Sequence, residues 1–487
     1  MQTQTNTTSF LSTRRGKLTL ALVCLAGFLD FIDTTIVNVA LPSIRQHLGF
    51  SEQSLQWVVS GYLLTYGGLL LLGGRAADLL GRRRLLIAGT SLFGLSSLVG
   101  GLAGSEAMLI AARLTQGLGA AMMTPAALSI LTTSFTEGTD RVKALGVWSG
   151  TIPLASAVGV LAGGLLSQGA GWRWVLFVNV PVCAVVIIGA RKVLPADRAA
   201  GVKDIDVLGA ILPTASALTF VYALVNAPNV GWSSARTILE LAAAAALMVG
   251  FVVNELRRSH PLFPLSIFRI KGLAAADATQ VIAQAGFLSL FFFITLYMQT
   301  VLHMSPIEAG AAYIPVTIGV GISSGISTQL LPRIGSRPLI TAGTLIGAAG
   351  VFLLSRIAAD GSYVADVLPG LVVMALGLGA VFVGVQNAAN TGVPAEQAGL
   401  AAALISASAT LGGALGLAIL SAIATSRTHH LLAAHAAHPL ALASGFGHAL
   451  LACSLLLVAA AVIATRTAST RGQQTPSVEP VIALEAA

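Results

Sequence analysis

Long apolar runs separated by short polar segments fill almost the entire chain. A helix needs about 20 mainly apolar residues to cross the ~30 Å hydrocarbon core of a bilayer. The pattern therefore predicts a chain of transmembrane helices rather than alternating strands. We predict fourteen spans, at residues 18–41, 54–74, 85–104, 107–134, 144–167, 173–193, 205–226, 236–254, 273–301, 307–330, 337–357, 364–388, 399–424 and 446–465.

Two longer polar segments, 194–206 and 255–271, divide these spans into sets of six, two and six. The two sets of six show a weak repeat, because segments 73–85 and 330–340 both place glycine and arginine between a second and a third helix. Internal repeats are common in secondary transporters, with the substrate between the halves. The predicted organisation is a cytoplasmic segment 1–17, a bundle 18–193, a two-helix linker 194–271, a bundle 272–465 and a disordered cytoplasmic tail 466–487.

Composition strengthens the membrane prediction. The 487 residues are 55% hydrophobic and only 9% charged, whereas soluble domains carry about 25% charged residues. Most of the 27 Lys and Arg residues fall in alternate loops, on the side of both termini. Basic loops stay in the cytoplasm, so we expect a multi-pass membrane protein with both ends cytoplasmic. The net charge of +8 then reflects membrane orientation, and we expect no nucleic-acid partner.

Three charged residues lie deep inside the predicted spans of the first bundle, several residues from either span end. Asp33 is about eight residues, or ~12 Å, from the outer end of its span, and Arg113 is about six residues, or ~9 Å, from the outer end of its own. A buried charge is costly without a partner, so we expect the two to lie within water-mediated reach. Asp30 lies nearer the midplane on an adjacent face. Two close carboxylates resist simultaneous ionisation, which suits proton binding; alternatively, one aspartate only hydrogen-bonds the bundle.

The second bundle offers a polar stripe along one helix, at Asp277, Gln280 and Gln284, extended by Phe287. This spacing places the side chains along one side of a helix. The stripe either lines a substrate cavity or faces its own bundle.

Other chemistry has little support in the sequence. Five histidines gather at 429–448 without a metal-binding spacing, and we expect an exposed outer loop there. The chain has no phosphate-binding GxxxxGK[ST] loop and no recognisable catalytic set. We therefore expect no enzyme, metal or cofactor, and a proton gradient as the energy source.

A series of motifs, in order, resembles the major facilitator superfamily, specifically its fourteen-span drug:proton antiporters. The resemblance covers about residues 18 to 465. It rests on the first-span sequence 33–42, the second loop, the fourth span and the entry to the sixth span. The matching residues include Gly74, Asp78, Gly81, Arg82, Arg83, Arg113, Gln116, Gly117, Gly119, Trp172, Arg173, Trp174, Asn179 and Pro181. The resemblance implies an all-α polytopic fold of two six-helix bundles with two extra central helices.

The resemblance also implies roles for particular residues. Proton coupling would fall to Asp33 with Arg113, and we add Asp30, which is outside the general family pattern. A conformational latch would comprise Gly74, Asp78, Gly81, Arg82 and Arg83, unless these form only an orientation-setting loop. A span-5 packing motif would comprise Gly150, Pro153, Gly159, Gly163 and Gly164, although Val160 stands where the family usually has proline. Asn38 and Gln116 would join Asp277, Gln280, Gln284 and Phe287 in the substrate cavity.

The expected function is proton-coupled export of hydrophobic or cationic small molecules, such as drugs or antibiotics, by alternating access. The expected partners are the substrate, protons and the lipid bilayer, with the chain acting as a monomer. Alternatives are a same-fold importer of a nutrient, a dedicated natural-product exporter, or a membrane sensor without transport.

Overall fold

The computed structural model is helical throughout its described part. It describes residues 10–51, 53–135, 139–195, 206–258, 261, 265–270, 272–391, 393 and 398–468. The side chains of Asp78 and Pro153, both singled out by the sequence, lie outside this description. Of the described helices, thirteen are long and apolar enough to span a bilayer. A further helix, Thr139–Gly169, covers the predicted fifth span. The prediction of an all-α polytopic fold is confirmed.

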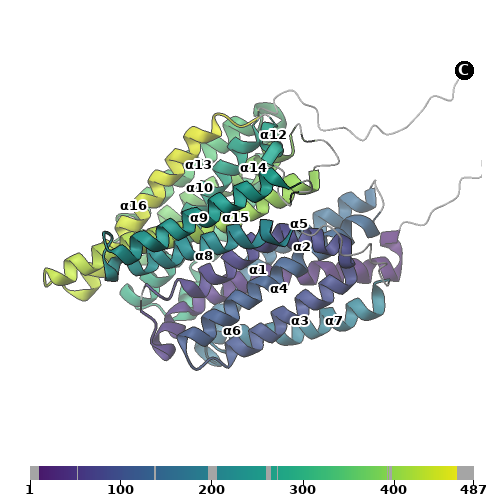
Figure 1. Cartoon of the computed structure of the whole chain (residues 1–487). Helices are drawn as coiled ribbons and strands as arrows, with labels where there is room; N and C mark the ends of the chain where they lie inside the picture. The colour runs from purple at the N-terminus through teal and green to yellow at the C-terminus, as the bar shows by residue number, and fades with distance from the viewer. Residues whose placement is uncertain are drawn as a thin grey trace, which may run out of the picture.

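The first bundle contains seven helices in the described residues, because the sixth span is divided near its start. They are α1 (Arg14–Leu48), α2 (Trp57–Leu80), α3 (Arg82–Gly101), α4 (Glu106–Ser134), α5 (Thr139–Gly169), α6 (Trp174–Phe177) and α7 (Asn179–Val193). Within this bundle α1 packs on α5, while α4 packs on both α2 and α3. Figure 1 shows this group in purple and blue along the lower side of the molecule.

The second bundle packs α10 against α15 and α16, and α13 against α14 and α16. Its elements are α10 (Leu273–Leu296), η3 (Tyr297–Val301), α11 (Pro306–Ala311), α12 (Ile314–Ile334), α13 (Ser336–Leu354), η4 (Tyr363–Val367), α14 (Leu368–Asn390), α15 (Ala398–Ala433) and α16 (His438–Ala464). It forms the green and yellow upper side of Figure 1.

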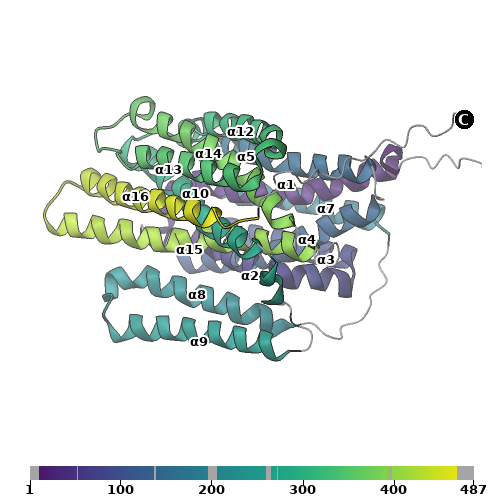
Figure 2. The same cartoon turned by 90° about the horizontal axis from the view of Figure 1, so that it is seen from above.

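Two helices between the bundles form a hairpin at the side of the molecule, α8 (Val207–Val230) and α9 (Ala235–Arg257). Helix α8 packs on α2 and α15, one helix from each bundle, and α9 lies outside it (Figure 2). Most of α9 is exposed, as expected for a lipid-facing helix. The remaining short elements are η1 (Phe10–Ser12) and η2 (Leu265–Arg269).

Glycines turn the chain at equivalent places in the two bundles. Gly81 between α2 and α3 has φ of 103°, and Gly335 between α12 and α13 has φ of 83°. Residues with a Cβ rarely adopt this region. The weak sequence repeat therefore corresponds to a shared tight turn between the second and third helices.

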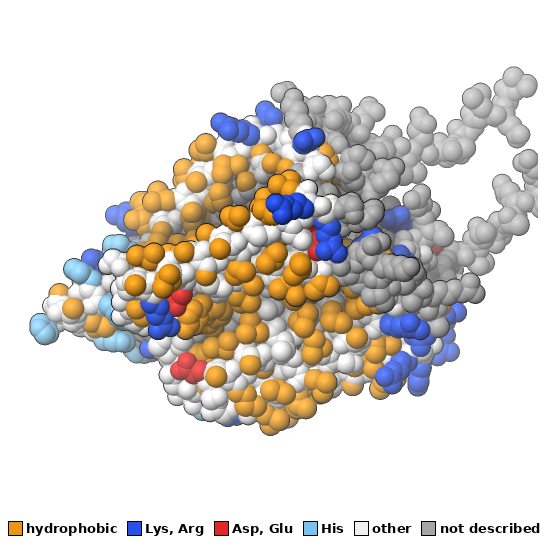
Figure 3. All heavy atoms as spheres, viewed as in Figure 1, with side chains coloured by type: hydrophobic (Ala, Val, Ile, Leu, Met, Phe, Trp, Pro, Cys, Tyr) orange, Lys and Arg blue, Asp and Glu red, His pale blue; other side chains and the backbone are white. Residues whose placement is uncertain are grey.

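The two described termini lie at the same end of the molecule (Figure 2). There Arg15 Nε, near the start of α1, donates to the Val193 carbonyl oxygen (3.0 Å). In the second bundle, Arg337 donates to the carbonyl oxygen of Thr467. Figure 3 shows mainly hydrophobic side chains along the flank and Lys and Arg gathered chiefly towards the bundle ends.

The histidine-rich segment differs from the expected loop. All five histidines are exposed, as predicted. However, α15 and α16 extend into this region, so only His435 lies in the turn between them. Alanine-rich sequence is a strong helix former, which explains the longer helices. Among the described residues no group of His, Cys, Asp and Glu could hold a metal ion.

Candidate coupling site in the first bundle

An ion pair is buried between α1 and α4. Arg113 Nη1 lies 2.5 Å from Asp33 Oδ2, and the two side chains are 2% and 0% exposed. The sequence predicted that these residues approach each other, and the structure brings them into direct contact rather than through water. Each charge removes part of the cost of burying the other.

Two amides complete the Asp33 site. Gln116 Nε2 and Asn179 Nδ2 both donate to Asp33 Oδ1, at 2.8 and 2.7 Å. The same amide groups donate to Ser97 Oγ, which links α3 to the cluster. Gln116 is fully buried and contacts Asp33, and its predicted place in a substrate cavity stays a prediction. Asn179 belonged to a recognised motif, but neither Asn179 nor Ser97 was singled out as a site residue.

Arg113 is fixed by α2 as well as by Asp33. Its Nε donates to the Val58 carbonyl oxygen (2.8 Å), and Nη1 donates to Gln116 Oε1 (2.7 Å). The guanidinium carbon lies 4.4 Å from the centre of the Tyr62 ring, within the range of a cation–π interaction. Arg113 is therefore held by hydrogen bonds, a carboxylate and an aromatic face.

Tyr62 connects this ion pair to Asp30. The Tyr62 hydroxyl donates to Asp30 Oδ1, and Thr124 Oγ1 donates to Asp30 Oδ2 at 3.3 Å. Asp30 is 2% exposed. No partner for Asp30 could be predicted from the sequence, and neither Tyr62 nor Thr124 stands out there, because neutral polar residues are frequent in the spans.

The cluster contains two buried carboxylates and one guanidinium. With both carboxylates ionised it carries one uncompensated negative charge, which is costly away from water. Uptake of one proton would neutralise the set. Because Asp30, Tyr62, Arg113 and Asp33 contact one another in series, a proton bound by one carboxylate changes the electrostatic potential at the other charged groups.

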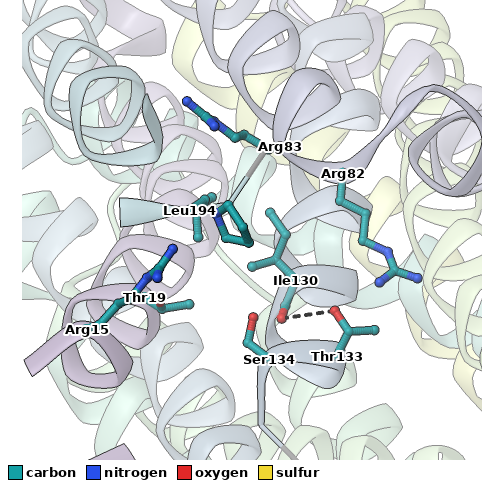
Figure 4. Close-up of a pocket in the computed structure, with 9 residues that line it drawn as sticks. Arg15, Thr19, Arg82, Arg83, Ile130, Thr133, Ser134 and Leu194 are labelled. Atoms are coloured by element: carbon teal, nitrogen blue, oxygen red, sulfur yellow. Dashed lines mark hydrogen bonds between the residues drawn. The ribbon is translucent and has the colours of Figure 1, made fainter. Parts of the chain in front are cut away.

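The basic first turn of α3 borders a cavity of about 400 Å³ at the end of the molecule where both described termini lie. Arg15, Arg82 and Arg83 lie around it with Leu194, as Figure 4 shows. Arg83 Nη2 donates to the Arg191 carbonyl oxygen (2.8 Å), so α3 is tied to the end of α7. An ideal Cβ at Gly74 would lie 3.8 Å from Pro125 Cβ. The proposed latch contact of Asp78 itself falls outside the described side chains.

Glycines bring α5 close to its neighbours. An ideal Cβ at Gly159 would lie 2.0 Å from Thr35 Oγ1, and one at Gly163 would lie 2.8 Å from the Ile36 carbonyl oxygen. Gly164 faces the second bundle, where its Cβ would lie 2.8 Å from Ile307 Cα. Gly150 has no atom within 4 Å, so it takes no part in this close packing.

Residues of the predicted substrate stripe have different surroundings. Asp277 and Gln280 are buried and Gln284 is half-buried. Phe287 is 1% exposed, and an ideal Cβ at Gly347 would lie 2.6 Å from its ring. Phe287 is thus packed inside the second bundle, and its place in a substrate cavity stays a prediction.

Asn38 is half-buried on α1. Its Nδ2 donates to the Thr34 carbonyl oxygen (3.1 Å), whereas Oδ1 has no partner among the described residues. It lies on α1, the helix that carries Asp30 and Asp33.

Comparison with known proteins agrees with this architecture. A family model described as Major Facilitator Superfamily matches residues 23–417. The puromycin resistance protein pur8 of Streptomyces alboniger is 38% identical over 88% of this chain and 86% of its own length. The cephamycin export protein CmcT of Amycolatopsis lactamdurans is 38% identical over 94% of both chains.

Solved structures share the fold at lower identity. An auto-inhibited POT family peptide transporter has a TM-score of 0.67 and 14% identity, covering 94% of this chain and 98% of its own. A bacterial homolog of the human lysosomal transporter Spinster, inward-facing and unoccupied, has a TM-score of 0.66 and 18% identity, covering 93% of this chain and 97% of its own. These similarities support the fold alone.

Proposed function

The chain belongs to the major facilitator superfamily, and from this premise we propose that it exports antibiotic-like small molecules in exchange for protons. The buried set of Asp33, Arg113 and Asp30 carries the proposal, because a carboxylate excess in a membrane interior is a natural proton acceptor. Relatives named for puromycin resistance and cephamycin export support the substrate class.

The proposed location is the cytoplasmic membrane of a bacterial cell, with both termini in the cytoplasm. The alternating distribution of basic loops supports this orientation. One chain contains both bundles, so alternating access requires no second copy, and we propose a monomer as the transporting unit.

Contacts between the bundles support a proposal about which end opens to the cytoplasm. Gln299 Nε2 donates to the Val39 carbonyl oxygen (2.9 Å), joining the bundles in the half away from the described termini. In the same half, an ideal Cβ at Gly310 would lie 2.7 Å from the Val160 carbonyl oxygen. We propose that substrate enters from the opposite, cytoplasmic end, and that the bundles then rock to reverse access.

Proton entry from outside would reset the transporter. We propose that a proton neutralises the excess charge around Asp33 and weakens its hold on Arg113, which is anchored to α2 through Val58. The ion pair thereby couples protonation to the relative positions of α1, α2 and α4. Proton return supplies about 2.3 kcal/mol per charge for each 100 mV of membrane potential.

Replacing Asp33 with Asn tests this function. In everted vesicles energised by a proton gradient, wild-type protein should accumulate puromycin, and D33N should lose accumulation because its amide cannot bind and release the proton. D360N is the control, since Asp360 is an exposed carboxylate of the second bundle.

Protein levels should be equal in all vesicles. Full accumulation by D33N, or wild-type accumulation that survives collapse of the gradient, would contradict proton coupling. Accumulation in right-side-out vesicles driven by an inward proton gradient would instead favour the importer.

A further inference from the structure

Helix α10 carries a buried carboxylate outside the coupling site. Asp277 is 5% exposed and lies about one turn, or ~6 Å, from the start of α10. Ser408 Oγ on α15 donates to Asp277 Oδ1 at 3.1 Å. Asp277 Oδ2 is buried and has no hydrogen-bond partner among the described residues. An ionised carboxylate would leave that oxygen uncompensated, whereas a protonated one carries no charge.

No described cation compensates Asp277. The elements packed against α10 are α1, α14, α15, α16, η2 and η3. Helix α14 and η3 contain no charged residue. The charged and histidine residues of α15 and α16 lie in the halves of those helices that are away from Asp277, at Arg427, His429, His430, His438 and His448. The groups on the remaining elements and beyond α16 are Arg14, Arg15, Lys17, Asp30, Asp33, Arg45 and His47 of α1, Arg269 of η2 and Arg466. None of these forms an ion pair with Asp277 in the described structure.

The hydrogen-bonded pair lies beside the contact between the two bundles. One turn after Ser408, an ideal Cβ at Gly412 would lie 2.3 Å from the Val281 carbonyl oxygen, so α10 and α15 touch at their backbones. Two residues after Ser408, Thr410 meets α2, where an ideal Cβ at Gly67 would lie 2.9 Å from it. Helix α15 is therefore held between Asp277 on α10 and the first bundle on α2.

Helix α2 also carries Tyr62, which donates to Asp30 in the first bundle. A change at Asp277 can thus reach the first coupling site through two helices in direct contact. The contacts among α10, α15 and α2 connect Asp277 physically to the first coupling site. A coupling element also requires two states, and the protonated and ionised forms of Asp277 supply them.

We propose that Asp277 is a second proton-binding site, which holds its proton on Oδ2 in this conformation. Loss of that proton leaves a charge that the closed α10–α15 contact does not solvate. Deprotonation therefore favours a conformation in which water or another donor reaches Oδ2. This inference rests on the proposed proton-coupled transport, but its direct test requires no substrate.

Infrared difference spectroscopy of purified full-length protein between acidic and alkaline pH tests the assignment. A protonated carboxylic acid has a C=O stretching band that disappears on deprotonation. We expect wild-type protein to show such a band, D277N to lack it, and D360N to retain it.

The S408A variant gives an independent readout if D277N folds poorly. Loss of the Ser408 hydrogen bond should move the Asp277 band to higher frequency without abolishing it. The inference is overturned if D277N keeps every protonated-carboxyl band, if S408A leaves all bands in place, or if the Asp277 band persists at every pH at which the protein remains folded. Because the D33N export assay is separate, failure here would leave the proposed function standing, and loss of coupling there would not remove an Asp277 band.

Discussion

Three side chains converge on the Asp33 carboxylate, and only one of them carries a charge. Arg113 supplies the charge, while Gln116 and Asn179 satisfy the second oxygen. The sequence could predict the Asp33–Arg113 pair because charged residues are rare in apolar spans and these two had similar depths. Tyr62 and Asn179 could not be selected in this way, since one sequence does not reveal which neutral polar side chains point inward.

Replacing Arg113 with Gln should destabilise the protein more than replacing both members of the pair. R113Q leaves a buried charge without its cation, which costs about 3–5 kcal/mol. The double variant D33N/R113Q removes both charges and should recover much of that loss. Thermal unfolding of the purified variants in detergent measures the difference. A double variant less stable than R113Q would show that the ion pair is not the dominant interaction.

At the scale of elements, glycine decides how closely α1 and α5 approach. Gly159 and Gly163 touch α1, whereas Gly150 of the same predicted motif faces open space. The family resemblance implies the motif, but the spacing of its glycines along a helix does not tell which of them meet a neighbour. Helix crossing determines that, because neighbouring helices touch over only part of their length.

A pair of matched substitutions tests this contact. G163V should impair export and lower thermal stability, because its side chain meets the Ile36 backbone, and overpacking typically costs about 1–3 kcal/mol. G150V introduces the same side chain into open space and should retain export and stability. Puromycin accumulation and thermal unfolding measure both effects. Equal behaviour of the two variants would rule out the α1–α5 contact as the reason that Gly163 is needed.

At the scale of the molecule, the described termini lie at one end and the α15–α16 turn lies at the other (Figure 2). Arg84 is exposed near the first end, and His435 is exposed in the turn. The three native cysteines are buried, so an introduced cysteine can report which side of the membrane each end faces.

Labelling of intact cells with a membrane-impermeant maleimide should distinguish the two ends. H435C should react in intact cells, whereas R84C should react only after the membrane is permeabilised. The wild-type chain controls for its native thiols. The reverse pattern would place the termini outside and refute the proposed orientation.

The sequence by itself determined the membrane class, the succession of spans and the charged residues that need partners. These follow from hydropathy, from the cost of burying charge and from the distribution of basic loops, all of which act locally along the chain. Only the tertiary structure decided that Tyr62 contacts both Asp30 and Arg113. It also decided that Gln116 donates a hydrogen bond to Asp33 and that the Phe287 ring packs inside the second bundle. Those contacts join residues far apart in the sequence, and helix crossing and rotation decide which side chains meet.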